Sequence, residues 1–389
     1  MTKVDGPWRD NAPTQDICAL LTNAGAQALF VGGCVRNALL GAPVSDIDIA
    51  TDAVPDRVME LARAAGVKAI PTGIAHGTVT LVRGGVPHEI TTFRRDISTD
   101  GRRATVAFST HIDEDAARRD FTMNALYARP DGTVLDPIDA LPDLIARRVR
   151  FIGRAEARIR EDYLRSLRFF RFHAWYGDPA GGMDPDAIAA IAANLDGLAH
   201  VSAERVTAEL LKLLAAPDPA PSVAGMRSAG LLARVLPGAD DRALAPLIHL
   251  EADAGVEPDP IRRLAALGGP ENLRLSRAQS ARLDRLREGI GDAAGPAELG
   301  YRQGAADAVD ILLLRAALAS LPWNHEAEKQ ALTGANRQFP VKPKDLMPTY
   351  QGPALGLRLA ELESAWIASG FTLGASELLA LPPKSTPKG

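Results

Sequence analysis

Two neighbouring stretches decide the fold: LFVGGCVRNALLG at residues 29–41 and SDIDIAT at residues 45–51. The first predicts a short strand that ends in two glycines and turns directly into a helix, which Gly41 then ends. Backbone N–H groups in such a turn can approach a phosphate closely, because glycine has no side chain to interfere. A Gly-Gly pair alone is weak evidence, since most such pairs are plain turns, so its weight depends on the second stretch.

Asp46 and Asp48 lie two residues apart in the β-like second stretch. Both carboxylates therefore project from one face, about 6–7 Å apart, while Ile47 and Ile49 point into the core. Such a pair suits Mg²⁺ bridging a nucleoside triphosphate, where the metal would activate an incoming 3′-hydroxyl and neutralise the attacked phosphate. The alternative is an edge strand with two solvated aspartates, which the preceding turn disfavours. Glu89, on a second predicted strand, is a candidate third carboxylate that spacing alone leaves open.

The rest of the chain predicts an α+β fold, with a mixed sheet at the start and helices after it. Predicted strands cover 28–31, 46–51, 78–82 and 86–93, with a hairpin turn at Gly84-Gly85. From Asp143 onward apolar residues recur at helical spacing, so the remainder should be almost entirely helical. The change of texture and the proline-rich breaks predict a first domain at 1–143, which carries the candidate carboxylates, and helical segments at 144–216, 217–275 and 276–389. These four segments are called head, neck, body and tail below. The last residues, 382–389, are expected to form a disordered tail.

Two later clusters carry charge next to apolar runs. In ARRDFTMNAL, residues 117–126, the charged residues either anchor a helix or hold ribose and phosphate. In REDYLRSLRFFRF, residues 160–172, the pattern predicts one helix with Asp162 and Arg165 on a shared face. Cytosine and adenine each show an amine beside a ring-nitrogen acceptor, so an Asp–Arg pair can satisfy either base and would reject uracil and guanine. The alternative is an ordinary ion pair within a helix.

Composition narrows the class of protein. The 389 residues, 46% hydrophobic and 24% charged, can form several soluble domains, and a net charge of −4 argues mildly against a non-specific RNA binder. Arginines cluster between residues 90 and 172, which suits phosphate contacts or, alternatively, solvated faces. Two cysteines are too few for a disulfide framework and fit a reducing, cytoplasmic compartment. No signal peptide or membrane span is expected.

Taken together, these stretches resemble the class II tRNA nucleotidyltransferase and bacterial poly(A) polymerase family. The resemblance covers nearly the whole chain and is most specific between residues 29 and 172. It implies a polymerase beta-like head, and Asp46 and Asp48 as catalytic metal ligands with Glu89 as a third carboxylate. Arg119, Asp120 and Asn124 would hold the ribose, and Asp162 with Arg165 would be the amino-acid template for the base. The nucleotide-binding residues that it implies are Gly32, Gly33, Arg36, Arg119, Asp120, Asn124, Asp162, Arg165 and Arg168.

The resemblance also covers a mobile loop between His76 and Arg103, which in the family helps to switch from C to A addition, and a tail domain around 339–346 and 352–366. Asn37 stands where the family usually has Asp, which puts a charge role there in doubt. Pro343 stands where many members have Gly, and no His-Asp pair marks a phosphohydrolase domain.

The function expected from the resemblance is Mg²⁺-dependent addition of CCA to the 3′ end of tRNA from CTP and ATP, with release of pyrophosphate. Its partners would be tRNA and the two nucleotides, with no membrane and no obligate protein partner. RNA recognition should rest on shape and backbone contacts. Three alternatives remain: a poly(A) polymerase, a specialist that adds only CC or only A, and an RNA-binding protein with an inactive head.

Overall fold

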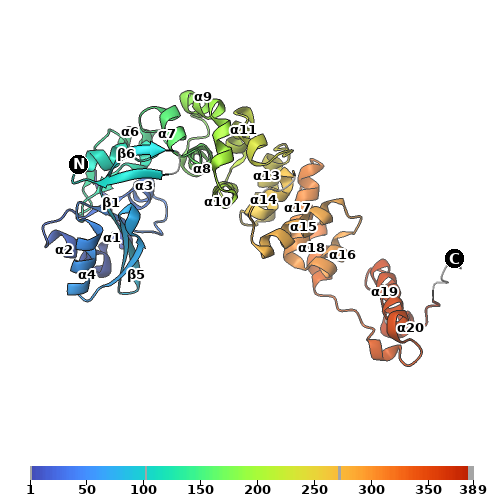
Figure 1. The fold of residues 1–389 in the computed structure, drawn as a ribbon. Helices are drawn as coiled ribbons and strands as arrows, with labels where there is room; N and C mark the ends of the chain where they lie inside the picture. Colours follow the sequence, from blue (N-terminus) through green and yellow to red (C-terminus); the bar gives the residue numbers. More distant parts are fainter. Residues whose placement is uncertain (1, 101–102, 270–272, 384–389) are drawn as a thin grey trace. The chain divides into compact units, whose positions relative to one another are not determined.

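The computed structural model describes residues 2–100, 103–269 and 273–383, without the side chains of 96–106. Contacts divide the chain into two compact units (Figure 1), and each unit is described by itself. Unit 1 contains Met1–Ala239 and Pro270–Arg274, and unit 2 contains Asp240–Gly269 and Leu275–Gly389. The predicted division into head, neck, body and tail stays a prediction.

Unit 1 begins with a seven-stranded sheet in the order β3-β4-β5-β2-β1-β8-β9. Neighbouring strands run antiparallel except β2 and β5, which are parallel, so the predicted mixed sheet is confirmed. A separate antiparallel pair, β6 and β7, follows β5. The strand bounds are β1 Leu29–Val31, β2 Asp48–Thr51, β3 Lys68–Gly73, β4 Thr78–Arg83, β5 Val86–Thr92, β6 Arg94–Asp100, β7 Arg103–Phe108, β8 Tyr127–Ala128 and β9 Val134–Leu135.

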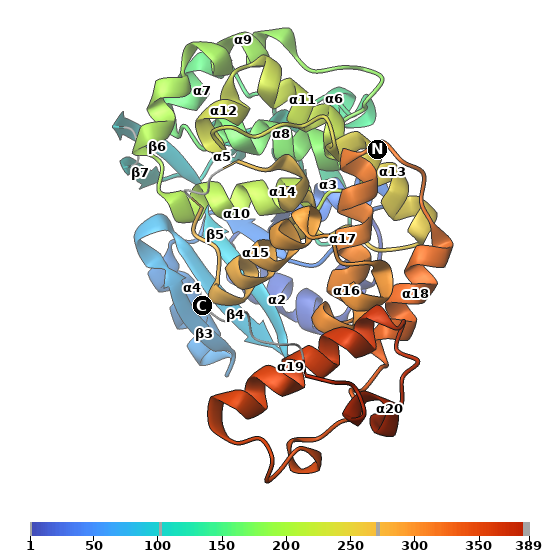
Figure 2. The same cartoon turned by 90° about the vertical axis from the view of Figure 1, so that its right-hand side faces the viewer.

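One face of the sheet is apolar and covered by helices. Val79, Leu81 and Ile90 are buried, and the helices α2 and α4 pack against β4 and β5. In Figure 2 the light-blue strands β3, β4 and β5 run side by side. Because side chains alternate along a strand, Glu89 points away from this core and is exposed. The helices of this part are α1 Pro7–Asp10, α2 Ala12–Thr22, α3 Gly33–Leu40, α4 Pro55–Ala64, α5 Ile112–Ala117 and α6 Leu141–Ile145.

The rest of unit 1 is helical and is built around α8. The ring of Phe169 in this helix stacks on that of Phe151 in the preceding loop, with the ring centroids 5.8 Å apart. The Phe151 ring also lies against Phe121 in a tilted arrangement, with the centroids 4.9 Å apart. On its other side α8 packs against α10 and α11. The helix bounds are α7 Ala155–Glu161, α8 Arg165–Tyr176, α9 Pro185–Ala193, α10 Ala203–Leu214, α11 Ala220–Ser228 and α12 Leu231–Val235.

Two local predictions are wrong at their edges. Strand β2 begins at Asp48, so Asp46 lies in the extended segment before it. The continuous helix predicted across 160–172 is broken at 162–164, between α7 and α8. Asp162 is extended there, with φ −154° and ψ 104°, and its carboxylate accepts a hydrogen bond from the backbone N–H of Leu164 at 3.2 Å. An aspartate side chain can accept hydrogen bonds from nearby backbone N–H groups that would otherwise bond within the helix, which explains the break.

The described residues of unit 2 form helices joined by loops, without a strand, in agreement with the predicted helical remainder. Its interior contains an ion network in which Arg262 and Arg263 both bind Glu251, and Arg262 also binds Asp310 at 2.6 Å. A second core, around Trp366, joins Tyr301, Phe339 and Phe371. The helix bounds are α13 Leu244–Ala254, α14 Pro260–Leu267, α15 Arg277–Gly291, α16 Pro296–Gln303, α17 Ala305–Leu318, α18 His325–Ala335, α19 Gly352–Ala368 and α20 Ala375–Leu379.

The departure at Pro343 fits its place in the fold. Pro343 begins a short 3-10 turn, Pro343–Asp345, where the first residue needs no backbone donor. The predicted disordered tail lies, from Lys384 onward, outside the described residues. Among the helices in the described ranges, none is long and apolar enough to cross a membrane.

Candidate active site

Asp48 is the first residue of β2 and lies opposite Glu89 of β5 in the parallel register. Asp46, two residues earlier, is exposed, whereas the intervening Ile47 is only 7% exposed and Ile49 is fully buried. The alternation places Asp46 and Asp48 on one side of the chain, and the register adds Glu89 beside Asp48. Long-range pairing thus places Glu89 beside Asp48, although the two residues lie about 40 positions apart in the chain.

The electrostatics of Asp48 suit a cation. Burial, with the negative charges of Glu89 and Asp46, raises the pKa of Asp48 to about 6, although Arg119 acts in the opposite direction. Mg²⁺ is commonly held by one or two carboxylates together with substrate phosphates, so Asp46 and Asp48 have the right donor chemistry. Within the described residues, no group of three or more His, Cys, Asp or Glu side chains is gathered tightly enough to hold a metal ion. The role of Glu89 as a third ligand therefore stays a prediction.

The raised pKa of Asp48 predicts a pH-dependent cost in stability. The pKa of Asp48 is higher in the folded protein than the ordinary 3.8, so folding favours the protonated carboxyl over the ionised one. The contribution of Asp48 to the free energy of unfolding is therefore complete below about pH 3.8 and is lost as the pH rises through about 6. In metal-free buffer, Asp48→Asn should therefore raise the free energy of unfolding by about 2 kcal/mol at pH 7.5 and hardly change it at pH 4. Urea denaturation with a chelator at the two pH values measures this. Asp56→Asn, on the exposed side of α4, is the control, and an equal effect of Asp48→Asn at both pH values would contradict the prediction.

The glycine turn lies next to a partly buried arginine, Arg119, whose side chain is 20% exposed. Gly32 caps the N-terminus of α3 with φ 69°, a conformation that favours glycine, and a Cβ atom added there would lie 3.4 Å from Nη1 of Arg119. Gly33 is the first residue of α3, so free backbone N–H groups of the helix end lie at this turn. The predicted phosphate turn and the predicted nucleotide-binding Arg119 are therefore neighbours.

Arg119 is held by two residues that the sequence did not single out, Asp115 and Tyr127. Asp115, 1% exposed, binds Nη2 of Arg119 at 2.8 Å and accepts a hydrogen bond from the Tyr127 hydroxyl at 2.7 Å. It also accepts a bond from the backbone N–H of Arg94 at 3.3 Å, at the start of β6. Burial opposes ionisation of Asp115, but Arg119 and the hydroxyl outweigh it and lower its pKa. Three consecutive acidic residues, 113–115, lie shortly before Arg119, so spacing alone could not identify Asp115.

Loss of the Asp115 charge should weaken the fold. Asp115→Asn leaves the guanidinium of Arg119 buried with one fewer charged partner, and we expect the free energy of unfolding to fall by about 3 kcal/mol. Chemical denaturation at neutral pH measures the change. Asp113→Asn, on the same helix, should have almost no effect, and equal losses for the two variants would refute the role of Asp115.

A chain of hydrogen bonds joins the other predicted nucleotide-binding residues. Asp120 accepts from Nδ2 of Asn124 at 2.8 Å and from Nε of Arg168 at 2.8 Å. Asn124 in turn accepts from Nη1 of Arg36 at 2.5 Å. Arg168 also lies 3.6 Å from Glu209 of α10, a partner that sequence reasoning missed. Residues from α3, the 117–126 segment and α8 therefore form one polar network.

Asp162 and Arg165 do not pair through their side chains. Asp162 binds Arg205 of α10, with Nη2 to Oδ2 at 2.7 Å and Nη1 to Oδ1 at 3.2 Å. Arg165 binds Glu161 and donates to the carbonyl oxygen of Arg158 at 3.1 Å. The two residues are linked through the backbone instead, since the N–H of Arg165 donates to the carbonyl of Asp162 at 2.9 Å. The sequence does not single out Arg205, because no pattern distinguishes it from any other arginine on an amphipathic helix.

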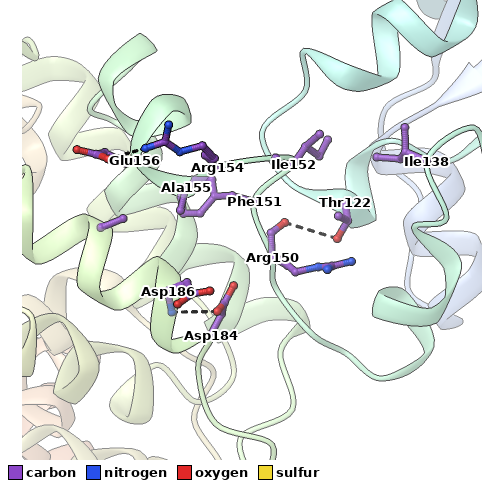
Figure 3. A pocket seen from close by; sticks show the side chains of 12 residues that line it. Thr122, Ile138, Arg150, Phe151, Ile152, Arg154, Ala155, Glu156, Asp184 and Asp186 are labelled. Carbon is purple, nitrogen blue, oxygen red and sulfur yellow. Dashed lines mark hydrogen bonds and ion pairs between the residues drawn. The ribbon is translucent and has the colours of Figure 1, made fainter.

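The segment predicted to contain a mobile loop begins at His76, the last residue of a short 3-10 turn, Ile74–His76, and continues into β4. Arg102, at its far end, lies outside the described residues, so its mobility stays a prediction. A pocket of about 640 Å³ lies elsewhere in unit 1, and apart from Thr122 its lining belongs to segments outside the predicted site (Figure 3). Arg150, Arg154, Glu156, Asp184 and Asp186 give it charges of both signs, which single out no ligand.

Comparison with known proteins places the chain in a family. Residues 28–150 match the family described as Poly A polymerase head domain, and residues 182–242 match that described as Probable RNA and SrmB- binding site of polymerase A. The human mitochondrial CCA tRNA nucleotidyltransferase 1 is 33% identical over 388 residues, which cover 92% of this chain and 86% of the human protein. The CCA-adding enzyme of Geobacillus thermodenitrificans is 43% identical over 220 residues, 56% of this chain and 52% of that protein.

Solved structures agree over nearly the whole length. The Bacillus stearothermophilus CCA-adding enzyme in complex with CTP has a TM-score of 0.72 and 30% identity, and the match covers 92% of this chain and 94% of that one. The Thermotoga maritima CCA-adding enzyme complexed with tRNA has a TM-score of 0.69 at 17% identity, over 97% of this chain and 98% of that one, which shows a shared fold. The chain therefore belongs to the class II family of CCA-adding enzymes and poly(A) polymerases.

Proposed function

We propose that this chain adds C, C and A to the 3′ end of tRNA without a template, using CTP and ATP and releasing pyrophosphate. The observation that carries the proposal is the polar network of unit 1, which joins Arg36, beside the glycine turn, through Asn124 and Asp120 to Arg168 of α8. A relative named as a CCA tRNA nucleotidyltransferase matches 92% of the chain, and one named as a CCA-adding enzyme matches 56%. The structures that it resembles include complexes with CTP, ATP and tRNA.

Members of this family are nucleotidyltransferases that use divalent metal ions, and we propose Mg²⁺ here. Asp46 and Asp48 would hold it, and when bound it would neutralise charge on the phosphate under attack and favour the ionised 3′-hydroxyl. The Gly32-Gly33 turn presents backbone N–H groups to the phosphates. Asp120 and Asn124 are assigned to the ribose.

The local bonding of Asp162 and Arg165 leaves room for a base. Asp162 already accepts three hydrogen bonds, two from Arg205 and one from Leu164 N–H, and a carboxylate has about four acceptor sites. One site thus remains for the exocyclic amine of cytosine or adenine. Arg165 uses Nη1 for Glu161 and Arg158, so in the described part of the chain its Nε and Nη2 remain for a ring nitrogen. Uracil and guanine would present a carbonyl to the carboxylate and an N–H to the guanidinium.

The test is the product formed on a tRNA transcript that lacks its last three nucleotides, incubated with protein, Mg²⁺ and all four nucleoside triphosphates. Addition of CCA followed by arrest is the expected result. A long A tract would indicate a poly(A) polymerase, and arrest after CC, or extension only of a transcript that already ends in CC, would indicate a specialist. Binding of tRNA with no addition under any condition would indicate an RNA-binding protein with an inactive head.

For the compartment, we propose the cytoplasm. The two cysteines, Cys18 and Cys34, are both free and buried, as expected of a protein in a reducing environment. The human relative is named as mitochondrial, so imaging of the tagged full chain in its own cells is the measurement that decides.

A further inference from the structure

The open face of the sheet in unit 1 carries threonine hydroxyls beside the candidate carboxylates. Asp48 of β2 lies opposite Glu89 of β5, and Glu89 lies opposite Thr80 of β4. Directly opposed side chains share a face, so Thr80 is on the side of the sheet that carries Asp48 and Glu89. Helices α2 and α4 cover the other face, whereas Glu89 and Thr72 are exposed and Thr80 is half-buried. The carboxylates and these hydroxyls therefore lie on one accessible surface.

An irregularity in β3 brings a second hydroxyl to Thr80. Ile70 lies opposite Thr80, but the pairing then shifts so that Gly73, and not Thr72, lies opposite Thr78. The shift lets Thr72 reach along the sheet, and its Oγ1 atom lies 2.9 Å from Oγ1 of Thr80. β-Bulges re-aim side chains in this way and are common next to active sites. The backbone of β3 thus holds Thr72 and Thr80 together as a hydroxyl pair.

This hydroxyl pair can form further hydrogen bonds. Each threonine hydroxyl has one O–H donor and two acceptor lone pairs, and the contact between the two uses one donor and one acceptor. In the part of the chain that the structure describes, neither Thr72 nor Thr80 has another side-chain hydrogen bond. One donor and several lone pairs remain for a partner that can both donate and accept. A sugar hydroxyl is such a partner.

The order of the strands leaves this side of Asp48 for the RNA. The glycine turn follows β1, on one side of β2, and Gly32 lies next to Arg119 there. Thr80 and Thr72 lie on β4 and β3, on the other side of β2. In phosphoryl transfer the attacking and leaving oxygens are roughly in line, so the RNA 3′ end approaches opposite the departing pyrophosphate. With the triphosphate at the glycine turn, the last ribose of the RNA lies over β5 and β4.

We propose that Thr80, oriented by Thr72, binds the 2′-hydroxyl of the last ribose of the RNA and thereby makes the enzyme prefer an RNA end to a DNA end. This inference rests on the proposed function and adds a specificity-determining residue on the side of the RNA. The 2′-hydroxyl distinguishes RNA from DNA, and it neighbours the attacking 3′-hydroxyl on the same ring. Neither threonine carries a charge to attract a phosphate, whereas the hydroxyl pair matches a sugar hydroxyl as donor and as acceptor. A bond there holds the 3′-hydroxyl beside Asp48 and Glu89.

The experiment uses the full chain with Mg²⁺, CTP and two versions of a tRNA transcript that lacks its last three nucleotides. One version ends in ribose and the other in 2′-deoxyribose, so the two differ by a single oxygen. The kcat/KM for addition of the first C is measured for the wild type, Thr80→Val, Thr80→Ser and the control Thr22→Val. Valine has the shape of threonine without the hydroxyl, and serine keeps the hydroxyl. Thr22 lies on α2, over the covered face of the same sheet, and donates to the carbonyl of Cys18 at 3.1 Å.

For the wild type we expect kcat/KM to be about tenfold higher with the ribose end, the effect of one hydrogen bond. Thr80→Val should lower kcat/KM for the ribose end about tenfold and leave that for the deoxyribose end unchanged, so the preference disappears. Thr80→Ser should retain most of the preference, and Thr22→Val should behave like the wild type. The KM for CTP should be the same in every variant, because the nucleotide lies on the other side of Asp48.

Two results would overturn the inference: a wild type that does not distinguish the two ends, or equal losses with both ends in Thr80→Val, which mark a structural role in the sheet. Failure of the proposed function looks different, because the wild type then adds nothing to either transcript. The affinities for short RNA oligonucleotides with the two ends decide that case. A preference for the ribose end that Thr80→Val abolishes keeps the hydroxyl pair as a sugar site, and equal affinities reject it.

Discussion

Replacing Asp48 with alanine should reduce nucleotide addition to tRNA by at least about a thousandfold in kcat/KM, while the affinity for tRNA stays within about twofold of the wild type. Asp48 is partly buried and stands opposite Glu89, and burial together with its acidic neighbours raises its pKa to about 6. Alanine removes the proposed metal ligand at the start of β2, and Asp46, which lies outside the strand, does not take its place. Primer extension on a truncated tRNA transcript measures the loss, and gel-shift titration measures binding.

Asp56→Ala is the matched control for Asp48→Ala. Asp56 is exposed on α4, which covers the apolar face of the same sheet, so its loss should leave turnover unchanged. Near-normal turnover of the Asp48 variant would remove the catalytic assignment. Simultaneous loss of tRNA binding would instead indicate a collapsed head.

The second large effect is on base choice. Asp162→Ala should raise the kcat/KM ratio of UTP to CTP by about a hundredfold, because no carboxylate acceptor then faces the uracil carbonyl. The fold-decrease in kcat/KM with CTP should be smaller than the fold-decrease in discrimination against UTP. Competition assays with paired nucleotides on a transcript that lacks CCA measure the ratio.

Glu204→Ala provides the control for Asp162→Ala. Glu204 is 70% exposed and precedes Arg205, the partner of Asp162, on α10. Its removal should leave the UTP to CTP ratio as in the wild type. Unchanged discrimination in the Asp162 variant would refute the template assignment and leave that aspartate as a structural partner of Arg205.

Local rules predicted the first part of the site well. Alternation predicted that Ile47 and Ile49 are buried, and the left-handed region at Gly41 ends α3 where the helix was expected to end. The Gly84-Gly85 turn joins β4 to β5, with positive φ at both glycines. Each of these features depends on a few adjacent residues, so the sequence around it contains the necessary information.

Features that depend on distant partners were not predictable in this way. The parallel pairing of β2 with β5 requires a crossover through β3 and β4, so no local pattern places Glu89 beside Asp48. Asp162 leaves the helix because Arg205, 43 residues later, and a local backbone bond hold it elsewhere. Asp115 and Tyr127 are identified only by the structure, through the bonds of their side chains to Arg119.

The start of β2 at Asp48 gives the two aspartates different freedom. Asp48 is anchored by the hydrogen-bonded ladder, whereas Asp46 lies in the exposed extended segment before it, where its carboxylate accepts a hydrogen bond from the hydroxyl of the adjacent Ser45 at 3.0 Å. Ordering an exposed side chain has an entropic cost of up to about 2 kcal/mol, and an arriving ligand can offset it. Asp48 is therefore fixed before any ligand arrives, whereas Asp46 is ordered only when a ligand binds. A metal ion alone should therefore bind weakly, and a metal ion together with a nucleotide should bind tightly.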